Sequence, residues 1–398
     1  MDTKKLNRRD FFRLTATAGA GALFMPDTAA ASLKINHAYR KVNEFPQRTL
    51  GRTGITIPIL SMGVMRADNP NVVRAAYNAG ITFFDTAHGY QNGQNEVMLG
   101  NFFKDKPRDS FCIATKGKFD FPLKDSFEND FTALLDLSLK RLQMDHVEIF
   151  YTHALNRIEQ VTDERIINLL KKFRADGKIR HIGFSTHALN PALIDAAVET
   201  GAYDVILLSY NFKLANLKET DEAIARGVEA GVGFVAMKTM TGAVEDAEGK
   251  KKINSQACLK WAWQNENITT VIPGFSNFDE FDECLAAVKD PVLTESERKY
   301  LAMLSTQEMM FCQQCGKCSE MCVEHLPIPD MMRAYMYAYG YKNATLSKET
   351  LQELRLPDRM CRSCGNGGCR VKCTSGFDVA RKIAAVTPVL HVPDVLLS

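Results

Sequence analysis

The sequence predicts a (β/α)8 barrel that is followed by a small α-rich domain. Three observations predict this order. Short apolar runs alternate with longer amphipathic stretches through residues 47–300, and polar residues follow several of the apolar runs. Eight of the eleven cysteines fall in two runs within residues 301–398. A separate N-terminal segment, residues 1–31, precedes both parts.

The barrel prediction depends on eight strand-helix units. The apolar runs are rich in Ile, Val and Phe, and the stretches between them are long enough for helices that cross over between parallel strands. Several of these helices follow an Asn or Asp that can cap them. Eight such units are typical of a (β/α)8 barrel. The predicted strands are 57–63, 81–85, 111–115, 146–153, 179–185, 204–210, 233–238 and 270–273, and the clearest helices are 129–142, 164–176 and 254–265.

The composition limits the partners of the chain. It has 398 residues, 45 % hydrophobic residues and a formal net charge of +2. A chain so near neutrality lacks the basic footprint that nucleic acid requires, so we expect no nucleic-acid partner. About 270 residues separate the N-terminal segment from the first cysteine run, which is enough for one large α/β domain.

Residues 1–31 resemble a twin-arginine export signal. The pair Arg8 and Arg9 precedes a weakly apolar stretch, residues 15–25, and three alanines stand at 29–31. An apolar stretch of roughly a dozen residues is too short to predict a membrane span. The resemblance implies export of the folded protein to the periplasm, whereas a signal that serves only as an anchor would leave it associated with the membrane. The alternative is a disordered basic tail.

Eight C-terminal cysteines form two runs with the spacing of cluster ligands. The first run is C-x2-C-x2-C-x3-C, by which a bacterial-type ferredoxin loop holds an iron-sulfur cube. The second is C-x2-C-x4-C-x3-C, and its glycine-rich insertion can loop out without moving the ligands. The fourth cysteine of each run typically crosses to the other cluster, so the pattern predicts two 4Fe-4S clusters in a ferredoxin-like domain, residues 301–398. The predicted ligands are Cys312, Cys315, Cys318, Cys322, Cys361, Cys364, Cys369 and Cys373.

Two other chemistries remain open for these cysteines. Zinc sites prefer paired C-x2-C units, and disulfides form in an oxidising compartment. Export of an already folded protein favours clusters, because thiolates that are bound to iron are poor candidates for disulfides. The other cysteines, Cys112, Cys258 and Cys284, lie in apolar segments and are expected in the core.

Polar residues end six of the predicted strands. In a (β/α)8 barrel the chemistry gathers at the carboxyl ends of the strands. Each residue alone could be a solvated strand end or part of a structural ion pair, but their joint occurrence favours a functional site. The six residues are Asp85, Lys116, His153, Ser185, Asn211 and Lys238.

Residues 84–90, Phe-Asp-Thr-Ala-His-Gly-Tyr, look like the signature that follows the second strand of aldo/keto reductases. The resemblance continues in segments 48–54, 177–185 and 272–274, and it covers most of the chain. With its trailing cysteine runs, the whole sequence is similar to the iron-sulfur branch of that superfamily.

This resemblance implies a catalytic tetrad of Asp85, Tyr90, Lys116 and His153. Tyr90 would protonate the oxygen of a carbonyl that receives hydride, and His153 would donate a hydrogen bond to that oxygen. Lys116 would lower the pKa of Tyr90, and Asp85 would keep Lys116 charged. The structural alternatives are a capped strand end, a core aromatic, a snorkelling lysine and a satisfied imidazole.

The resemblance also implies a nicotinamide cofactor, NAD or NADP, although two positions depart from the family pattern. Relatives that bind one end strand five in Ser-Asn and place a Gln after strand six, whereas here Thr186 follows Ser185 and Leu207 takes the Gln position. The segment after strand eight lacks the usual Lys or Arg for a 2′-phosphate, and its acidic residues would repel one. The candidate cofactor residues are Ser185, Thr186, Lys238, Ser276 and Asn277, of which the last two precede a helix.

Together these features predict an exported oxidoreductase that interconverts a carbonyl and an alcohol, with clusters that relay electrons to or from a redox partner protein. Hydride carries two electrons and a cluster takes one, so a flavin or a partner would be needed between nicotinamide and cluster. The alternative is an electron-transfer or binding protein with a catalytically silent barrel. A Met/Tyr-rich stretch, residues 331–341, either packs around the clusters or faces a partner.

Overall fold

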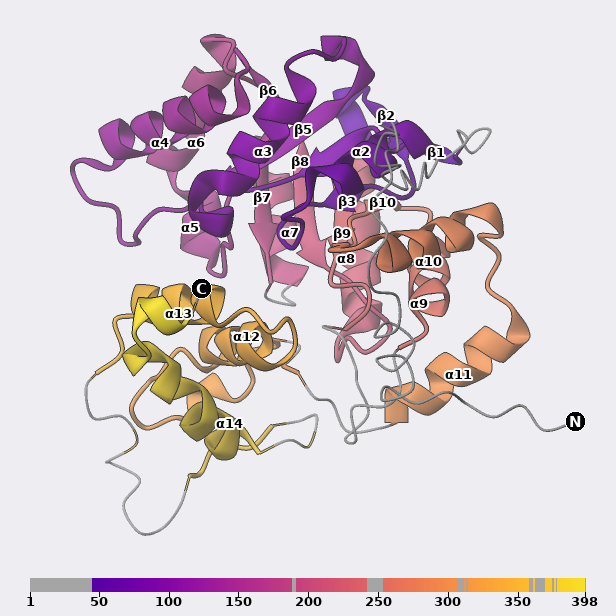
Figure 1. Cartoon of the computed structure of the whole chain (residues 1–398). Helices are drawn as coiled ribbons and strands as arrows, with labels where there is room; N and C mark the ends of the chain where they lie inside the picture. Colours follow the sequence, from indigo (N-terminus) through magenta and orange to yellow (C-terminus); the bar gives the residue numbers. More distant parts are fainter. Residues whose placement is uncertain are drawn as a thin grey trace, which may run out of the picture. The chain divides into compact units, whose positions relative to one another are not determined.

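The computed structural model describes residues 45–187, 191–241, 253–306, 311–312, 314–357, 361, 369–373, 376 and 378–397. These residues belong to one compact unit that spans Tyr39–Ser398, and Figure 1 shows the order of its elements. The predicted export signal, residues 1–31, and the predicted cluster ligand Cys364 lie outside the described residues.

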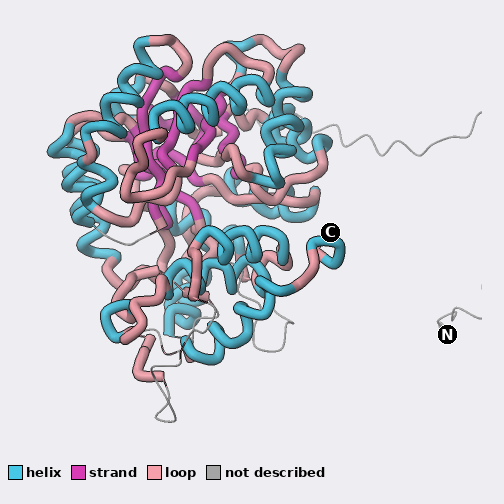
Figure 2. Tube along the Cα trace, turned by 90° about the vertical axis from the view of Figure 1, so that its left-hand side faces the viewer, coloured by secondary structure: helices cyan, strands magenta, loops and turns pink. Residues whose placement is uncertain are grey.

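Eight parallel strands form the barrel that the sequence predicts. Strands that follow one another in sequence are neighbours in the sheet, from β3 to β10. A parallel bridge between Leu60 and Val271 closes the sheet, and Ser61 N–H donates to the carbonyl of Val271. The strands lie inside a layer of helices (Figure 2). They are β3 (Met62–Gly63), β4 (Phe83–Asp85), β5 (Cys112–Gly117), β6 (Val147–Thr152), β7 (Ile179–Thr186), β8 (Val205–Ser209), β9 (Gly233–Met237) and β10 (Ile268–Val271).

The first predicted strand, 57–63, is wrong as a single element. Its beginning, β2 (Thr56–Pro58), pairs antiparallel with β1 (Gln47–Thr49), and only its end, β3, belongs to the barrel. The run looks continuous because Ile57 and Met62 are both fully buried, but against different neighbours. Leu50 and Ile57 of the hairpin pack inside the barrel, so the hairpin covers the amino ends of the strands.

Alternation along the strands divides the core into two layers. Successive side chains of a strand point to opposite faces. Phe83 packs inside the barrel and Phe84 packs against the helices, and Ile149 and Phe150 divide in the same way. Filling of the interior by side chains makes the barrel a packed core rather than a pore.

The barrel helices begin as the sequence predicts, and the three expected helices are confirmed to within a few residues. Asn69, Asp163 and Asn254 cap their helices by accepting hydrogen bonds from backbone N–H groups. None of the helices in the described part of the chain is long and apolar enough to cross a membrane. The helices are α2 (Pro70–Ala79), α3 (Gln94–Phe103), α4 (Phe127–Leu142), α5 (Ile158–Thr162), α6 (Glu164–Ala175), α7 (Pro191–Thr200), α8 (Leu217–Glu229), α9 (Ser255–Trp263), α10 (Phe278–Lys289) and α11 (Glu295–Thr306).

The C-terminal segment contains α12 (Ile328–Tyr339), α13 (Ala344–Glu353) and α14 (Val379–Val386). Ala334, Leu351 and Val386 join these three helices in one apolar cluster. Ion pairs connect the segment to the loop after β5, with Lys118 contacting Glu353 and Arg355 lying 2.9 Å from Asp120. The segment therefore lies against the carboxyl ends of the barrel strands.

Candidate active site at the carboxyl ends of the strands

A buried ion pair joins the ends of β4 and β5. Lys116 Nζ donates to Asp85 Oδ1 at 2.5 Å and to the carbonyl of Thr86 at 2.6 Å. Burial opposes both charges, so it raises the pKa of Asp85 and lowers the pKa of Lys116, while each partner acts in the opposite direction. The two residues stabilise each other's charge in a site that excludes water.

Tyr90 lies in a tight loop after β4. Gln91 and Asn92 have left-handed backbone conformations, with φ of 51° and 52°. The Gln91 side chain donates to the carbonyls of Met65 and Ala67, each at 3.2 Å. Gly93 has φ of 84°, and a Cβ there would lie 2.2 Å from the guanidinium carbon of Arg141. This constrained backbone holds Tyr90 at the carboxyl ends of the strands.

The structure brings the four residues of the predicted tetrad together. Lys116 Nζ lies 5.0 Å from the centre of the Tyr90 ring. The rings of Tyr90 and His153 meet edge to face, with centroids 5.9 Å apart and planes at 80°. Burial lowers the pKa of His153 well below its usual value, and the positive Lys116 adds to this effect. The lowered pKa favours the neutral imidazole of His153 beside the phenol.

The pKa of Tyr90 differs from the expectation. Burial raises it, and the negative charge of Asp85 raises it further. The positive charge of Arg333 lowers it, by less than burial and Asp85 raise it.

Arg333 reaches this site from the C-terminal segment. It lies on α12, is only 8 % exposed, and forms an ion pair of 2.7 Å with Asp330. A cavity of about 190 Å³ is lined by Arg333 together with Tyr90, Lys116 and His153. A segment outside the barrel thus contributes a charged side chain to the surroundings of the tetrad.

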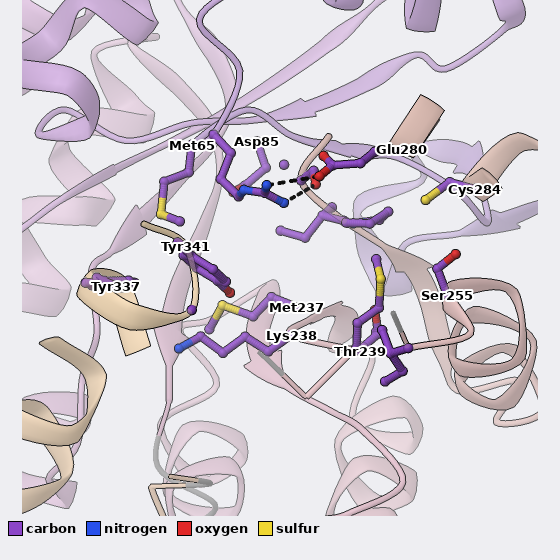
Figure 3. A pocket seen from close by; sticks show the side chains of 18 of the residues that line it. Met65, Asp85, Met237, Lys238, Thr239, Ser255, Glu280, Cys284, Tyr337 and Tyr341 are labelled. Carbon is purple, nitrogen blue, oxygen red and sulfur yellow. Dashed lines mark hydrogen bonds and ion pairs between the residues drawn. The ribbon is translucent and has the colours of Figure 1, made fainter. Parts of the chain in front are cut away.

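A larger cavity of about 460 Å³ begins beside the tetrad (Figure 3). Asp85 and Tyr90 line one part of it, and Gly274 and Glu280, around the start of α10, line another. Tyr337 of α12 and the following Tyr341 also line the cavity, and Figure 3 shows both among the side chains around it. Its volume lies in the usual range for small-molecule and cofactor sites. The cavity is therefore large enough for a small-molecule ligand that contacts both the tetrad and the start of α10.

The candidate cofactor residues are not gathered at this cavity. Of the five, only Lys238 lines it. Ser185 is buried, and its hydroxyl accepts from the N–H of Ala154 at 2.9 Å. Thr186 is buried beside it, while Ser276 and Asn277 precede α10. Leu207, at the position of the expected Gln, packs inside the barrel.

Lys238 follows β9 in a left-handed backbone conformation, with φ of 56°. Asn211 Nδ2 donates to its carbonyl at 3.3 Å and helps to hold this turn. Burial lowers the pKa of Lys238 to about 7, and the positive Arg333 contributes to the shift. Lys238 Nζ lies 5.9 Å from the centre of the Tyr337 ring, and the thiol of Cys312 acts on it in the opposite direction. Cys312 of the first cysteine run therefore lies close enough to Lys238, at the carboxyl end of β9, to affect its charge.

The cysteine runs approach each other in the described residues. Burial raises the pKa of Cys312 to about 12, and the nearby thiols of Cys318, Cys315 and Cys373 add to the shift. Cys373, the fourth cysteine of the second run, therefore lies near the first run, and Cys322, the fourth cysteine of the first run, acts on Cys318 as well. The N–H of Gln314 donates to Cys312 Sγ at 3.1 Å, which favours the thiolate.

The predicted cluster ligands do not form a metal site among the described residues. Cys318, Cys315 and Cys373 act electrostatically on Cys312, and Cys315, Cys373 and Cys322 act on Cys318. Within the described ranges no group of three or more His, Cys, Asp or Glu could hold a metal ion, and no disulfide joins the described cysteines. Cys258 and Cys284 are buried core residues, as expected, and Cys112 is half-buried against the barrel interior.

Several site residues are absent from the sequence prediction. Arg66, His187, Arg333, Tyr337 and Tyr341 line the two cavities. Three of them fall within the Met/Tyr-rich stretch, which was expected to pack around clusters or to face a partner. The stretch divides: its methionines at 331 and 332 pack with the cysteines, whereas the tyrosines at 337 and 341 line the barrel cavity. The Met/Tyr-rich stretch was noticed in the sequence because it lies near the first cysteine run. The structure shows that its tyrosines at 337 and 341 line the cavity of the barrel.

The fold and this arrangement of Asp, Lys, Tyr and His define a barrel of the oxidoreductase class. A model of the aldo/keto reductase family matches residues 61–254. L-galactose dehydrogenase of Arabidopsis thaliana is 29 % identical over 289 residues, which cover 61 % of this chain and 88 % of that protein. D-threo-aldose 1-dehydrogenase of a Pseudomonas species is 27 % identical over 50 % of this chain and 70 % of that protein.

Solved structures show the same fold. The holo form of an aldo-keto reductase from Bacillus halodurans superposes with a TM-score of 0.54 and 21 % identity, over 66 % of this chain and 96 % of that structure. The family model and the relatives support membership of the aldo/keto reductase superfamily, and the protein is an aldo/keto reductase-like oxidoreductase. The family model ends before the first cysteine run.

Proposed function

We propose that the protein interconverts a small-molecule carbonyl and the corresponding alcohol in the barrel, and that its cysteine runs hold two 4Fe-4S clusters that exchange electrons with a redox partner protein. One observation carries the catalytic part: Tyr90, His153 and the Asp85–Lys116 pair converge beside a cavity of about 460 Å³. Relatives with dehydrogenase and reductase names support the same reaction type.

The side chains divide the proton chemistry among them. A nicotinamide, when bound, supplies or accepts hydride at the carbon. Tyr90 is the acid that protonates the carbonyl oxygen, and neutral His153 donates a hydrogen bond to the same oxygen. The Lys116 ammonium lies against the phenol ring and stabilises negative charge on it, while Asp85 holds that ammonium in place.

The cysteines give the electron-transfer part of the proposal. Cys312, Cys315 and Cys318 with Cys373 would hold one cluster, and Cys361, Cys364 and Cys369 with Cys322 the other. The clusters supply one-electron transfer. Cys312 acts electrostatically on Lys238, and Arg333 acts on both Lys238 and His153, so these two cations lie near one another between the first run and the tetrad. Export to the periplasm is part of the proposal and is supported by the twin-arginine pattern alone.

A silent barrel is the second candidate. The placement of Leu207 inside the barrel and of Ser185 and Thr186 away from the cavity favours it. In this alternative the chain would transfer electrons or bind a partner without turnover in the barrel.

The test is mass spectrometry of the small molecules released by denaturing the exported protein, purified without oxygen, together with analysis of iron and sulfide. Bound NAD or NADP with iron and sulfide would support the complete proposal. Iron and sulfide alone would leave turnover with added cofactor and a panel of alcohols as the deciding measurement. Absence of turnover in that assay would reject the enzyme in favour of the silent barrel.

A further inference from the structure

Arg333 of α12 has hydrogen-bond donors that its ion pair does not use. The side chain is buried and lines the cavity of about 190 Å³, which we call the smaller cavity. Within the described part of the chain, the guanidinium forms one ion pair, from Nη2 to Asp330 Oδ1 at 2.7 Å. A guanidinium has five N–H donors in a planar fork, so Nε and Nη1 remain for another partner. A buried cation with unused donors at a cavity indicates a binding site for an anion.

The smaller cavity is the place where a substrate carbonyl meets its proton donors. Tyr90, Lys116 and His153 line it together with Arg333. Tyr90 also lines the larger cavity, but His153 lines the smaller one alone. A carbonyl oxygen that accepts from both Tyr90 and His153 must therefore lie at the smaller cavity. Arg333 thus faces the substrate side of the site.

Packing on two sides fixes the helix that carries Arg333. Arg333 and Tyr337 are four residues apart, so they share one face of α12, and both line the smaller cavity. Met331 and Met332 pack instead with cysteines of the first run. The guanidinium is therefore oriented before a ligand arrives, which lowers the cost of binding.

The other charged groups around the smaller cavity leave room for one negative charge. Burial lowers the pKa of His153, and the positive charges of Lys118 and Arg333 contribute to the shift. Two acidic residues, Glu349 and Glu353, also line the cavity. Glu353 is paired with Lys118, and burial together with the nearby Glu353 raises the pKa of Glu349, which favours its neutral form.

Size and charge define the class of anion. A cavity of about 190 Å³ lies below the range of about 300–1,000 Å³ that is usual for drug-sized ligands. The anionic group and the reacting carbonyl must therefore be only a few bonds apart. A carboxylate matches the fork of Arg333 and carries one charge, whereas a phosphate ester brings about −1.5 to −2 against Glu349 and Glu353.

We propose that Arg333 binds a carboxylate of the substrate, and that the barrel interconverts a small oxo acid and the corresponding hydroxy acid. The inference rests on the proposed function for the reaction and adds the substrate class. In the reduction, hydride from a reduced nicotinamide adds to the carbonyl carbon with both electrons, and Tyr90 gives a proton to the oxygen. The carboxylate stays unchanged on Arg333, which binds and orients the substrate and transfers no proton.

The experiment is calorimetric titration of the full-length protein, purified without oxygen, with oxamate and with its neutral methyl ester. Oxamate has a carboxylate beside an amide carbonyl and so resembles a small oxo acid. Each titration is made with and without NAD. We expect the wild type to bind oxamate at least about tenfold more tightly than the ester, because charge-assisted hydrogen bonds to Arg333 require the carboxylate.

Variants test the assignment to Arg333. Arg333→Met should lose about tenfold or more in affinity for oxamate and bind the ester as the wild type does. Arg333→Lys should lie between the two, since an ammonium lacks the planar fork. Arg355→Met, at an exposed ion pair with Asp120, removes an arginine of the same segment and should bind oxamate as the wild type does. If Arg333→Met does not fold because Asp330 is left unpaired, Asp330→Asn is added to it, with the same expected loss.

Two results would overturn the inference: oxamate binding to the wild type no more tightly than its ester, or undiminished oxamate binding in a folded variant without Arg333. Tighter binding of inorganic phosphate than of oxamate would overturn the choice of a carboxylate. Failure of the proposed function is distinguishable, because neither an oxo acid nor its ester would then be turned over with added nicotinamide, whereas oxamate binding tests Arg333 without turnover. In an active enzyme, Arg333→Met should raise KM for the oxo acid and leave KM for the ester unchanged.

Discussion

Lys116 Nζ lies 2.5 Å from Asp85 Oδ1, and each residue is only 2 % exposed. The second carboxylate oxygen, Asp85 Oδ2, is buried without a hydrogen-bond partner in the described structure. Neither charge is stabilised by water, so each depends on the other. A change to either residue of the pair should therefore affect both the stability of the protein and its activity.

We expect Lys116→Met to lower both activity and stability. The change leaves the Asp85 carboxylate buried and unpaired, which typically costs about 3–5 kcal/mol of unfolding free energy. Asp85→Asn added to Lys116→Met should recover much of that stability, because it removes the unpaired charge, but it should not recover turnover. Urea unfolding and steady-state kinetics of the three variants check this. Equal stability of Lys116→Met and the double variant would contradict the account of the pair.

Tyr90→Phe tests the acid. The change removes one oxygen and keeps the ring that contacts His153. Turnover should fall by about 100-fold or more, the usual contribution of a general acid, with the cluster absorbance unchanged. Tyr77→Phe is the matched control, because Tyr77 bonds Ser110 on the outer side of the barrel. Turnover that survives Tyr90→Phe would refute the assignment.

The repeated strands of the barrel could be predicted because each one is a short apolar run, and its apolar residues indicate that the strand is buried. The last seven strand predictions overlap the observed strands, and the alternation of Phe83 with Phe84 places one side chain in each core layer. The apolar pattern gave a wrong prediction at 57–63, because this one run contains both β2, which pairs with β1, and β3, which pairs with β4. Nothing within the run marks the change from antiparallel to parallel pairing.

The candidate site shows a similar division. Asp85, Lys116 and His153 could be predicted because strand ends of a barrel meet at one rim. Arg333 and Tyr337 could not, because they lie far away in sequence, on a helix whose position depends on tertiary contacts such as that between Lys118 and Glu353. The net rise in the pKa of Tyr90 could not be predicted either, because burial, its largest cause, depends on the folded structure.

Arg333 should shift the pH range of turnover, in addition to the larger effect of burial. Its positive charge lowers the pKa of both His153 and Tyr90, so Arg333→Met should raise both. In carbonyl reduction the active forms are neutral His153 and protonated Tyr90. Activity is then lost as pH falls through the first pKa and as pH rises through the second, and both limits should move to higher pH.

Three measurements check the role of Arg333. Arg333→Lys keeps the charge and should retain limits near those of the wild type. Arg226→Met, at a surface ion pair with Asp195, is the control for loss of an arginine elsewhere. Melting temperatures show whether the loss of the ion pair with Asp330 unfolds the variant. An unmoved pH profile in folded Arg333→Met would reject the electrostatic role.

The export prediction concerns residues 1–31. Replacement of both Arg8 and Arg9 by Lys should keep the precursor inside the cell, because the paired arginines are the feature that the export route reads. Fractionation of cells and detection of the precursor in the cytoplasm measure this. Replacement of Lys4 and Lys5 by Arg keeps the charge of the segment and should leave export intact. Continued export of the double Lys variant would discredit the signal.

The proposed crossing of Cys373 to the first cluster predicts which cysteines would share a cluster. Cys315→Ser and Cys373→Ser should remove iron from the same cluster, so each should lose about half of the bound iron, and the double variant should lose no more than either alone. Cys322→Ser combined with Cys315→Ser should lose nearly all of it, because Cys322 would serve the other cluster. Cys258→Ser, a buried residue of α9, should keep all its iron. Iron analysis and low-temperature electron paramagnetic resonance of the reduced proteins measure these losses. Additive losses for Cys315→Ser and Cys373→Ser would show that the two thiols belong to different clusters, and the crossing would then be rejected.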